Sequence, residues 1–322
     1  MKSTADFENY FSTSLTPLLQ SLEVERKNVV TTFWSAMNYS VLFIPALIPF
    51  FMFQNPWFLV ILVLPFLLVI KRLIIYQKVK DQYVKNFKQQ VISGMVKQVN
   101  EKLTYEPEFS ISTGEYAGSQ IFNQRIDRFK GGDLISGQLE KTSIRFSELW
   151  HEEKHVSTDS KGRRAESWVT IFKGIFFIAD FNKDFTGKLF VLPDWGIDFL
   201  GIGKWTDKVF ESRGQAIDLE DPVFEKYFKC YGTDQVESRY ILSTSLMKRL
   251  TDFREKVKIK IYISFIASRV FIAIPLTKDL FEPNVFSTGM KDDYLQEYFY
   301  YLTLVTGIVD DLNLNTRIWT KQ

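Results

Sequence analysis

The chain has 322 residues, and 40 lysines and arginines stand against 38 aspartates and glutamates, so the formal net charge is only +2. This balance excludes the strongly basic composition that is typical of nucleic-acid-binding proteins, and we expect no nucleic-acid partner. The single cysteine, Cys230, excludes an internal disulfide framework and fits a reducing compartment.

A long stretch near the N-terminus carries no charged residue. It runs from Asn28 to Ile70 and contains two apolar blocks, Phe33–Phe53 and Trp57–Ile70. Each block with its flanks approaches the roughly 20 residues that a helix needs to cross the hydrocarbon of a bilayer. Asn55 is a preferred helix-capping residue, and Pro56 suits the first helical position. We predict a transmembrane helical hairpin; two buried helices of a soluble protein are the alternative.

Positive charges indicate how this hairpin is oriented. They lie on both flanks, whereas the turn between the blocks has no lysine or arginine. The flanking residues are Lys2, Arg26 and Lys27 before the hairpin and Lys71, Arg72, Lys78, Lys80, Lys85 and Lys88 after it. The positive-inside rule therefore predicts that both termini and the main domain are cytoplasmic.

The pattern divides the chain into four parts. Residues 1–27 are predicted to include an amphipathic cytoplasmic helix, which lies either on the inner leaflet or on the soluble domain. Residues 28–76 form the hairpin, and residues 77–106 a juxtamembrane helix that ends before Pro107. Residues 107–322 form the cytoplasmic domain.

Residues 107–322 combine helical and strand patterns, so we predict an α+β fold around an antiparallel sheet. The strands are expected at Leu134–Leu139, Ser143–Trp150, Ser167–Phe181, Lys188–Leu192, Ile259–Phe265 and Val270–Ile274. Ser157–Ala165 reads as a hairpin tip, and Lys173-Gly174 as a bulge or kink. Helices are expected at Ser119–Phe129, at Val223–Phe228, from Asp234 toward Leu242, from Thr244 to about Lys256 and at Asp292–Leu312.

The sharpest chemical motif is His151-Glu152-Glu153-Lys154-His155, which matches H-E-x-x-H. On a helix this spacing places two histidines on one face, where they bind zinc, and the glutamate acts as general base. The residues before His151 alternate like a strand, however, and on a strand positions four apart lie about 13 Å apart. We therefore assign no catalytic, metal or cofactor residue; His151, Glu152 and His155 are the candidates of an alternative zinc site.

A small basic patch is formed by Arg125, Arg128 and Lys130. Positive residues of a membrane-anchored chain attract anionic lipid headgroups. The alternative is an ordinary solvated surface. Cys230 has no second cysteine and no nearby histidine in the sequence, so we do not assign it as a nucleophile.

Two segments carry a resemblance to a known family. The run Trp168–Lys183 resembles one segment of an uncharacterised bacterial membrane-protein family, catalogued as a domain of unknown function, number three thousand one hundred thirty-seven. Pieces between Leu219 and Leu242 resemble a second block. The similarity is expected to run from the hairpin to about Phe286. It implies paired transmembrane segments followed by a cytoplasmic domain in the bacterial inner membrane, and no activity.

These observations predict a membrane-anchored cytoplasmic binding or scaffold module and favour a non-catalytic role. The alternatives are a subunit of a larger inner-membrane complex that docks through its helical hairpin, and a zinc-dependent hydrolase that uses His151, Glu152 and His155. The expected partners are the lipid bilayer and a protein at the membrane. No cofactor is predicted, and the sequence leaves the oligomeric state open.

Overall fold

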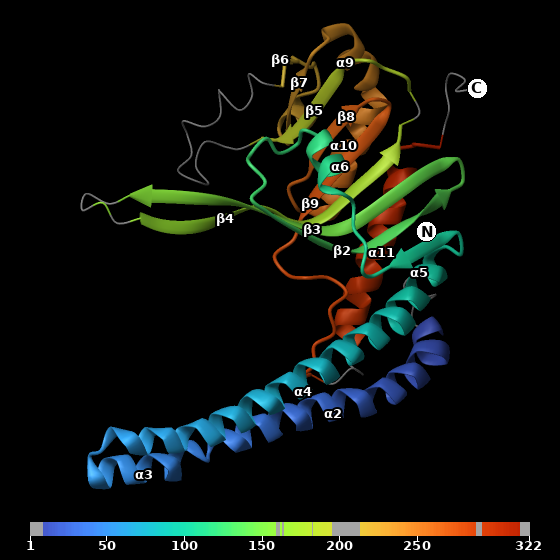
Figure 1. The fold of residues 1–322 in the computed structure, drawn as a ribbon. Helices are drawn as coiled ribbons and strands as arrows, with labels where there is room; N and C mark the ends of the chain where they lie inside the picture. Colours follow the sequence, from blue (N-terminus) through green and yellow to red (C-terminus); the bar gives the residue numbers. More distant parts are fainter. Residues whose placement is uncertain are drawn as a thin grey trace. The chain divides into compact units, whose positions relative to one another are not determined.

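A computed structural model describes residues 9–158, 162, 164–181, 183–194, 213–287 and 292–315. The chain divides into two compact units. The helical unit comprises Lys2–Gln98 and Phe281–Phe299, and the sheet unit comprises Val99–Leu280 and Tyr300–Gln322, with Met1 assigned to it as well. The units are coloured along the sequence in Figure 1.

The helical unit is built on two long helical stretches, Phe11–Phe53 and Pro56–Val99, of 43 and 44 residues. Their segments are η1 (Phe11–Leu15), α2 (Thr16–Ser40), α3 (Phe43–Phe53), η2 (Pro56–Leu62), α4 (Val63–Phe87), η3 (Lys88–Ile92) and α5 (Ser93–Val99). Both stretches are long and apolar enough to cross a membrane. The two long apolar helices predicted from the sequence are therefore confirmed, and the first stretch continues without a break through Thr16-Pro17.

The turn between the stretches has the predicted chemistry. Gln54 takes a left-handed conformation with φ 49° and ends α3. The Asn55 side chain then accepts a hydrogen bond of 3.0 Å from the Trp57 backbone N–H, and Pro56 takes the first helical position. The helix starts as a tight 3₁₀ segment, η2, before it becomes α4.

The segment that precedes α11 belongs to the helical unit and is held there by specific contacts. Arg26 binds both carboxylate oxygens of Glu23 at 2.7 Å and donates to the Val285 carbonyl at 2.8 Å. Lys88 forms an ion pair of 2.6 Å with Glu282. The rings of Phe33 and Phe286 lie 5.1 Å apart, edge to face.

The described residues of the sheet unit form a nine-stranded antiparallel sheet with the order β1-β2-β3-β4-β9-β8-β5-β7-β6 (Figure 1). The strands are β1 (Leu103–Glu106), β2 (Arg128–Leu139), β3 (Thr142–Thr158), β4 (Arg164–Asp180), β5 (Lys188–Pro193), β6 (Gln215–Ala216), β7 (Phe228–Gly232), β8 (Tyr262–Ile266) and β9 (Arg269–Pro275). The predicted α+β fold around an antiparallel sheet is confirmed.

The described residues of the sheet unit also form helices. They are α6 (Thr113–Gly118), α8 (Pro222–Glu225), α9 (Gln235–Ile241), α10 (Thr244–Val257) and α11 (Asp292–Asp311), whose first turns belong to the helical unit. Asp221 and Asp234 cap α8 and α9 through their side chains. The helix expected at Val223–Phe228 is shorter than predicted, because Phe228 already begins β7, a strand that the sequence analysis missed.

The helix expected at Ser119–Phe129 is wrong. The helix lies earlier, in α6, where the Ser112 side chain caps the Glu115 N–H, and Phe129 belongs to β2. The apolar residues that suggested a helix instead reach the core from an irregular segment: Ile121 is buried, and the Phe122 ring stacks 5.2 Å from Phe172. The spacing of these apolar residues therefore reflects their contacts with the core and not the period of a helix.

Gly131, two residues beyond the helix predicted from the sequence, lies within β2. An added Cβ there would lie 2.6 Å from the Ser110 side chain and 2.7 Å from Leu149, so the residue permits a close approach of neighbouring segments.

The kink expected at Lys173-Gly174 takes a different form. The register between β3 and β4 shifts between the pairs His151↔Phe172 and Glu152↔Thr170, so Ile171 is the extra residue of a bulge. Gly174 has φ +147° and lies against the backbone of β9. The strand therefore changes direction near the predicted place, by two separate devices.

Three sequence-based expectations fall partly outside the described residues. These are the first residues of the N-terminal helix, the tip of the Ser157–Ala165 hairpin and most of residues 194–216, where repeated glycines in the sequence indicate a loop.

Candidate functional site

His151 of the H-E-x-x-H motif is completely buried in the sheet unit, beside Tyr116 of α6. Its Nε2 lies 3.1 Å from the Arg125 carbonyl oxygen, and its Nδ1 lies 3.0 Å from the Tyr116 hydroxyl. A carbonyl only accepts, so Nε2 carries the proton and donates, and Nδ1 accepts from the Tyr116 hydroxyl. Both ring nitrogens of His151 are engaged by these two partners.

Burial sets the ionisation of this pair. It lowers the pKa of His151 and raises the pKa of Tyr116, because the charged form of each is poorly solvated. Both side chains are therefore neutral near pH 7, as the hydrogen bond between them requires. Tyr116 also packs edge to face on Phe176, with ring centroids 5.0 Å apart.

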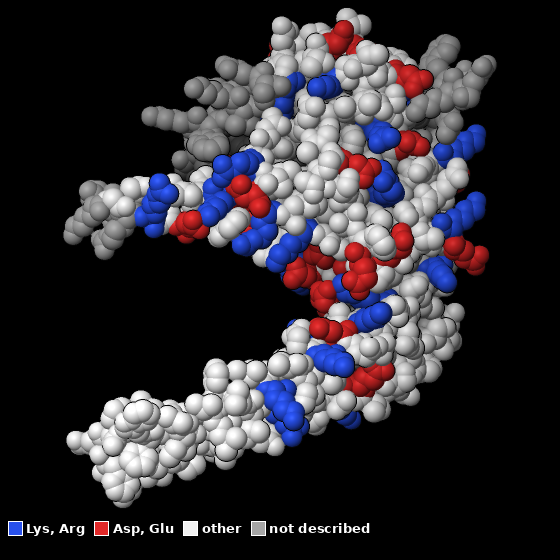
Figure 2. Space-filling view, viewed as in Figure 1, with Lys and Arg blue, Asp and Glu red and all other residues white. Residues whose placement is uncertain are grey.

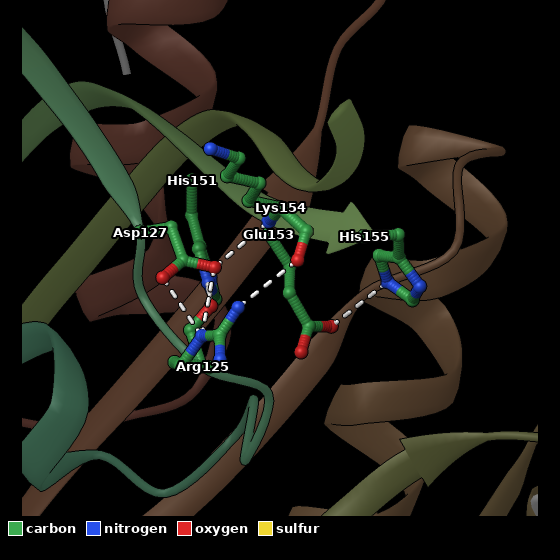
Figure 3. Close-up of polar contacts among 6 residues, drawn as sticks. All are labelled: Arg125, Asp127, His151, Glu153, Lys154 and His155. Atoms are coloured by element: carbon green, nitrogen blue, oxygen red, sulfur yellow. Dashed lines mark hydrogen bonds and ion pairs between the residues drawn. The ribbon is translucent and has the colours of Figure 1, made fainter. Parts of the chain in front are cut away.

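The other two motif residues lie elsewhere. Glu152 points to the opposite face of β3 and forms an ion pair of 2.9 Å with Arg128 of β2. His155 is exposed, and its nearest described partner is Glu153 at 3.3 Å, as Figure 3 shows. The same figure shows Asp127 receiving bonds from Arg125 and from the Lys154 backbone N–H.

The structure does not bring the motif together. Glu152 is separated from both histidines by the sheet, and His151 and His155 are four residues apart on a strand, about 13 Å. Among the described residues, no group of three or more histidine, cysteine or carboxylate side chains is arranged to hold a metal ion. The arrangement around His151 is that of a structural hydrogen-bond network within the core.

A second feature is the part of β3 and β4 that extends beyond the rest of the sheet (Figure 1). The pairing of β2 with β3 ends at Arg128↔Glu152, and that of β9 with β4 ends at Gly174↔Pro275. Within the described residues, Glu153–Thr158 therefore pair only with Arg164–Val169, and Thr170–Phe172 form the base of this extension, where they pair with β3 alone. We call this two-stranded extension the ribbon.

One face of the ribbon and its base is lined by tryptophan and basic side chains, and we call it the ribbon face. Antiparallel register and alternation place its members on one side of the sheet. They are Arg128, Lys130, Trp150, Glu152, Lys154, Val156, Arg164, Glu166, Trp168, Thr170 and Lys173.

Cations pack on both tryptophan rings of the ribbon face. The Arg128 guanidinium lies 3.9 Å from the centre of the Trp168 ring. The ammonium groups of Lys130 and Lys173 lie 5.2 and 5.1 Å from the Trp150 ring. These contacts are within the range of cation–π attraction and keep the flat indole groups at the surface, where Trp168 is 40% exposed.

The ribbon face has an excess of positive charge. Its five basic residues face two carboxylates of its own, Glu152 and Glu166, and Lys173 reaches Asp279 at 2.6 Å. Lys154 pairs with Glu166 at 2.7 Å. Neither Lys130 nor Arg164 forms an ion pair within the part of the chain that the structure describes. Figure 2 shows blue side chains gathered along this extension and at its base.

The sequence analysis found only part of this surface. It grouped Arg125, Arg128 and Lys130, but Arg125 is turned to Asp127 and to the Lys154 carbonyl. The tryptophans were missed, although Trp150 and Trp168 both lie in alternating segments. Cys230 is buried in β7, and burial raises the pKa of its thiol, which opposes any role as a nucleophile.

Residues 170–314 match the model of a family described as a protein of unknown function (DUF3137). The match confirms the resemblance to this family of unknown function, but it covers neither the hairpin nor β1–β3, and it extends past Phe286 to Leu314, beyond the end of α11. Comparison with the curated proteins and with the solved structures found no match. The family description assigns no activity.

Proposed function

We propose that the chain is a membrane-anchored module whose helical hairpin spans the bilayer and whose sheet unit binds a partner at the cytoplasmic surface without catalysis. Both termini are then cytoplasmic, as the distribution of lysine and arginine favours. The bacterial inner membrane is the location that the family resemblance of the Trp168–Lys183 segment implies.

The observation that carries the anchor is the exposure of large apolar side chains along the two helical stretches. Trp57 is 79% exposed, and Phe51 and Met52 are each 71% exposed. A water-soluble protein rarely leaves so much contiguous apolar surface uncovered, whereas hydrocarbon covers it without cost. The alternative of two buried helices in a soluble protein is not supported by this exposure.

The non-catalytic part of the proposal rests on the described side chains. The one motif with a catalytic spacing is divided between a buried hydrogen-bond network, an ion pair and a solvent-exposed histidine. The ribbon, in contrast, offers exposed strands and a face of tryptophan and basic residues, which is a binding surface in chemical terms.

The test is membrane topology. Asn55→Cys places a thiol in the predicted external turn, and Val236→Cys places one on α9 of the sheet unit, where Val236 is 79% exposed. In intact bacterial cells, an impermeant maleimide should label position 55 and not position 236, and disruption of the cells should expose position 236. Labelling of position 236 in intact cells, or extraction of the protein by carbonate, would contradict the proposal.

A subunit of a larger inner-membrane complex is a second candidate. The exposed apolar surface of α3, which contains Pro45 and Pro49, is suited to packing against other membrane helices. Purification in a mild detergent should then recover a stoichiometric partner. Recovery of the chain alone as a monomer would count against this candidate and leave the anchored module in place.

A further inference from the structure

We propose that the ribbon face binds the anionic headgroups of the membrane in which the chain is anchored. This inference rests on the proposed function, because the anchor supplies the membrane, and it names the partner of the sheet unit as a lipid surface.

The ribbon is unusual in having no covering element within the described residues. Its side chains from Arg164 to Thr170 are exposed throughout, whereas those from Phe172 to Ala179 of the same strand are nearly all buried. An isolated two-stranded ribbon is marginally stable in water. A strand pair that leaves its sheet in this way gains stability when a surface covers one of its faces.

The chemistry of the ribbon face matches an anionic interface between water and hydrocarbon. Tryptophan concentrates at the headgroup level of membranes because its ring is apolar and its N–H is polar. Trp168 and Val156 are 40% and 55% exposed, and both lie on this face. Arg128, Lys130, Lys154 and Arg164 surround them with the positive charge that attracts anionic lipid.

The opposite face of the ribbon lacks this combination. Alternation places Glu153, His155, Ser167 and Val169 there, so it has a carboxylate and no lysine or arginine among its described strand residues. Only one side of the ribbon is therefore complementary to a negatively charged surface, and that gives the contact a defined orientation.

Because the chain is anchored, a modest affinity of the ribbon face for lipid headgroups is sufficient for docking. The sheet unit is joined to the second apolar stretch by a continuous chain, so binding to the same bilayer is intramolecular and takes place at a high effective concentration. A surface with few uncompensated charges is then able to dock reversibly, in a manner that responds to lipid charge and salt.

The experiment uses the full chain reconstituted in nanodiscs. An environment-sensitive fluorophore is attached to Val156→Cys on the ribbon face, and to Val236→Cys on α9 as the control probe. The wild-type protein, whose one cysteine, Cys230, is buried, is treated in the same way and gives the background labelling. Discs of phosphatidylcholine alone are compared with discs that also contain phosphatidylglycerol. The probe at 156 should brighten and shift to the blue only with phosphatidylglycerol, and the probe at 236 should not respond.

A charge variant sharpens the test. Lys130→Gln with Arg164→Gln should lower the docked-to-free ratio at least about tenfold, because each basic residue near an anionic surface contributes about fivefold. Lys229→Gln with Lys248→Gln removes the same charge from the sheet unit outside the ribbon face and should leave the response unchanged. High salt should abolish the response of the wild-type protein.

The outcomes separate this inference from the proposed function. Incorporation into discs with a silent probe at 156 overturns the lipid contact and leaves the anchor standing. An equal response in neutral discs, or an equal loss in both double variants, also overturns it, because headgroup charge would not be what is recognised. Failure to incorporate at all overturns the anchor and this inference together.

Discussion

The apolar residues of the two units differ in their exposure to solvent. In the sheet unit, Phe172, Phe176 and Phe177 are at most 2% exposed, because β3, β4 and β9 pack them into a core. In the helical unit, Trp57 and Phe51 are mostly exposed. Both regions are rich in phenylalanine, so composition alone does not separate them. The two regions are distinguished by the absence of charge over a stretch long enough to span a bilayer, which indicates that lipid surrounds the helical hairpin and water surrounds the sheet unit.

The largest effect is expected from Gly174→Ala in β4. Gly174 has φ +147°, and an added Cβ would lie 2.2 Å from the Ile274 carbonyl oxygen, which is backbone and has little room to move. We expect a loss of more than about 4 kcal/mol in the free energy of unfolding of the sheet unit, measured by thermal denaturation in detergent. The helical hairpin should still insert into membranes.

The matched control is Gly114→Ala in α6, where nothing lies within 4 Å of the added Cβ. Alanine should stabilise this helix by about 0.5–1 kcal/mol or leave it unchanged. A Gly174→Ala protein as stable as the wild type would show that β4 and β9 do not approach as closely as the structure has them.

The next largest effect is expected on the membrane insertion of the helical unit. Leu64→Arg places a charge near the middle of the apolar block Trp57–Ile70, where Leu64 is 66% exposed. Insertion into the membrane should become less favourable by about 3–4 kcal/mol, measured as the fraction of the chain that resists carbonate extraction. Val236→Arg on α9 should change neither insertion nor stability. Normal insertion of Leu64→Arg would argue against a membrane-spanning helix.

A smaller effect is expected from His151→Ala. It leaves the Tyr116 hydroxyl and the Arg125 carbonyl without their partner in the core, which should cost about 2–3 kcal/mol in unfolding free energy. Tyr116→Phe removes one of these two hydrogen bonds and should cost about 1 kcal/mol. If both substitutions were neutral, the buried network would not be a structural one.

The same residue predicts a pH dependence. Burial lowers the pKa of His151 below its ordinary value of 6.5, so below about pH 6.5 the unfolded chain takes up a proton that the folded chain does not. The sheet unit should therefore lose stability as the pH falls from 6.5, and His151→Ala should lack that part of the slope. Denaturant titrations at several pH values measure it.

The smallest effect is expected from His155→Ala. His155 is exposed and its described partner is Glu153, so its loss should change stability by less than about 0.5 kcal/mol. Metal analysis of the purified wild-type and variant proteins should find no stoichiometric zinc in either. Zinc at one per chain that is lost in the variant would restore the zinc hydrolase as a candidate.

The sequence predicted the features that depend on local pattern. The charge-free run from Asn28 to Ile70 predicted two long apolar helices, and alternation predicted the strands that became β8 and β9. The cap at Asn55 was expected from residue type, and Asp221 and Asp234 cap their helices in the same way, because a short polar side chain before a helix satisfies its first N–H groups wherever the helix lies.

Tertiary structure decided what depends on neighbours far away in the chain. Ile121, Phe122 and Phe129 have a helical spacing, but packing on Tyr116 and pairing with β3 hold them in a loop and a strand. In the H-E-x-x-H motif, alternation along β3 turns Glu152 away from the two histidines, and His155 is exposed because it lies in the ribbon, beyond the part of the sheet that buries His151. The ribbon face combines β2, β3 and β4, and only their register places Arg128 on Trp168, forty residues away in the sequence. A local pattern reports the period of the backbone, whereas a surface is made by strands that meet across the sheet.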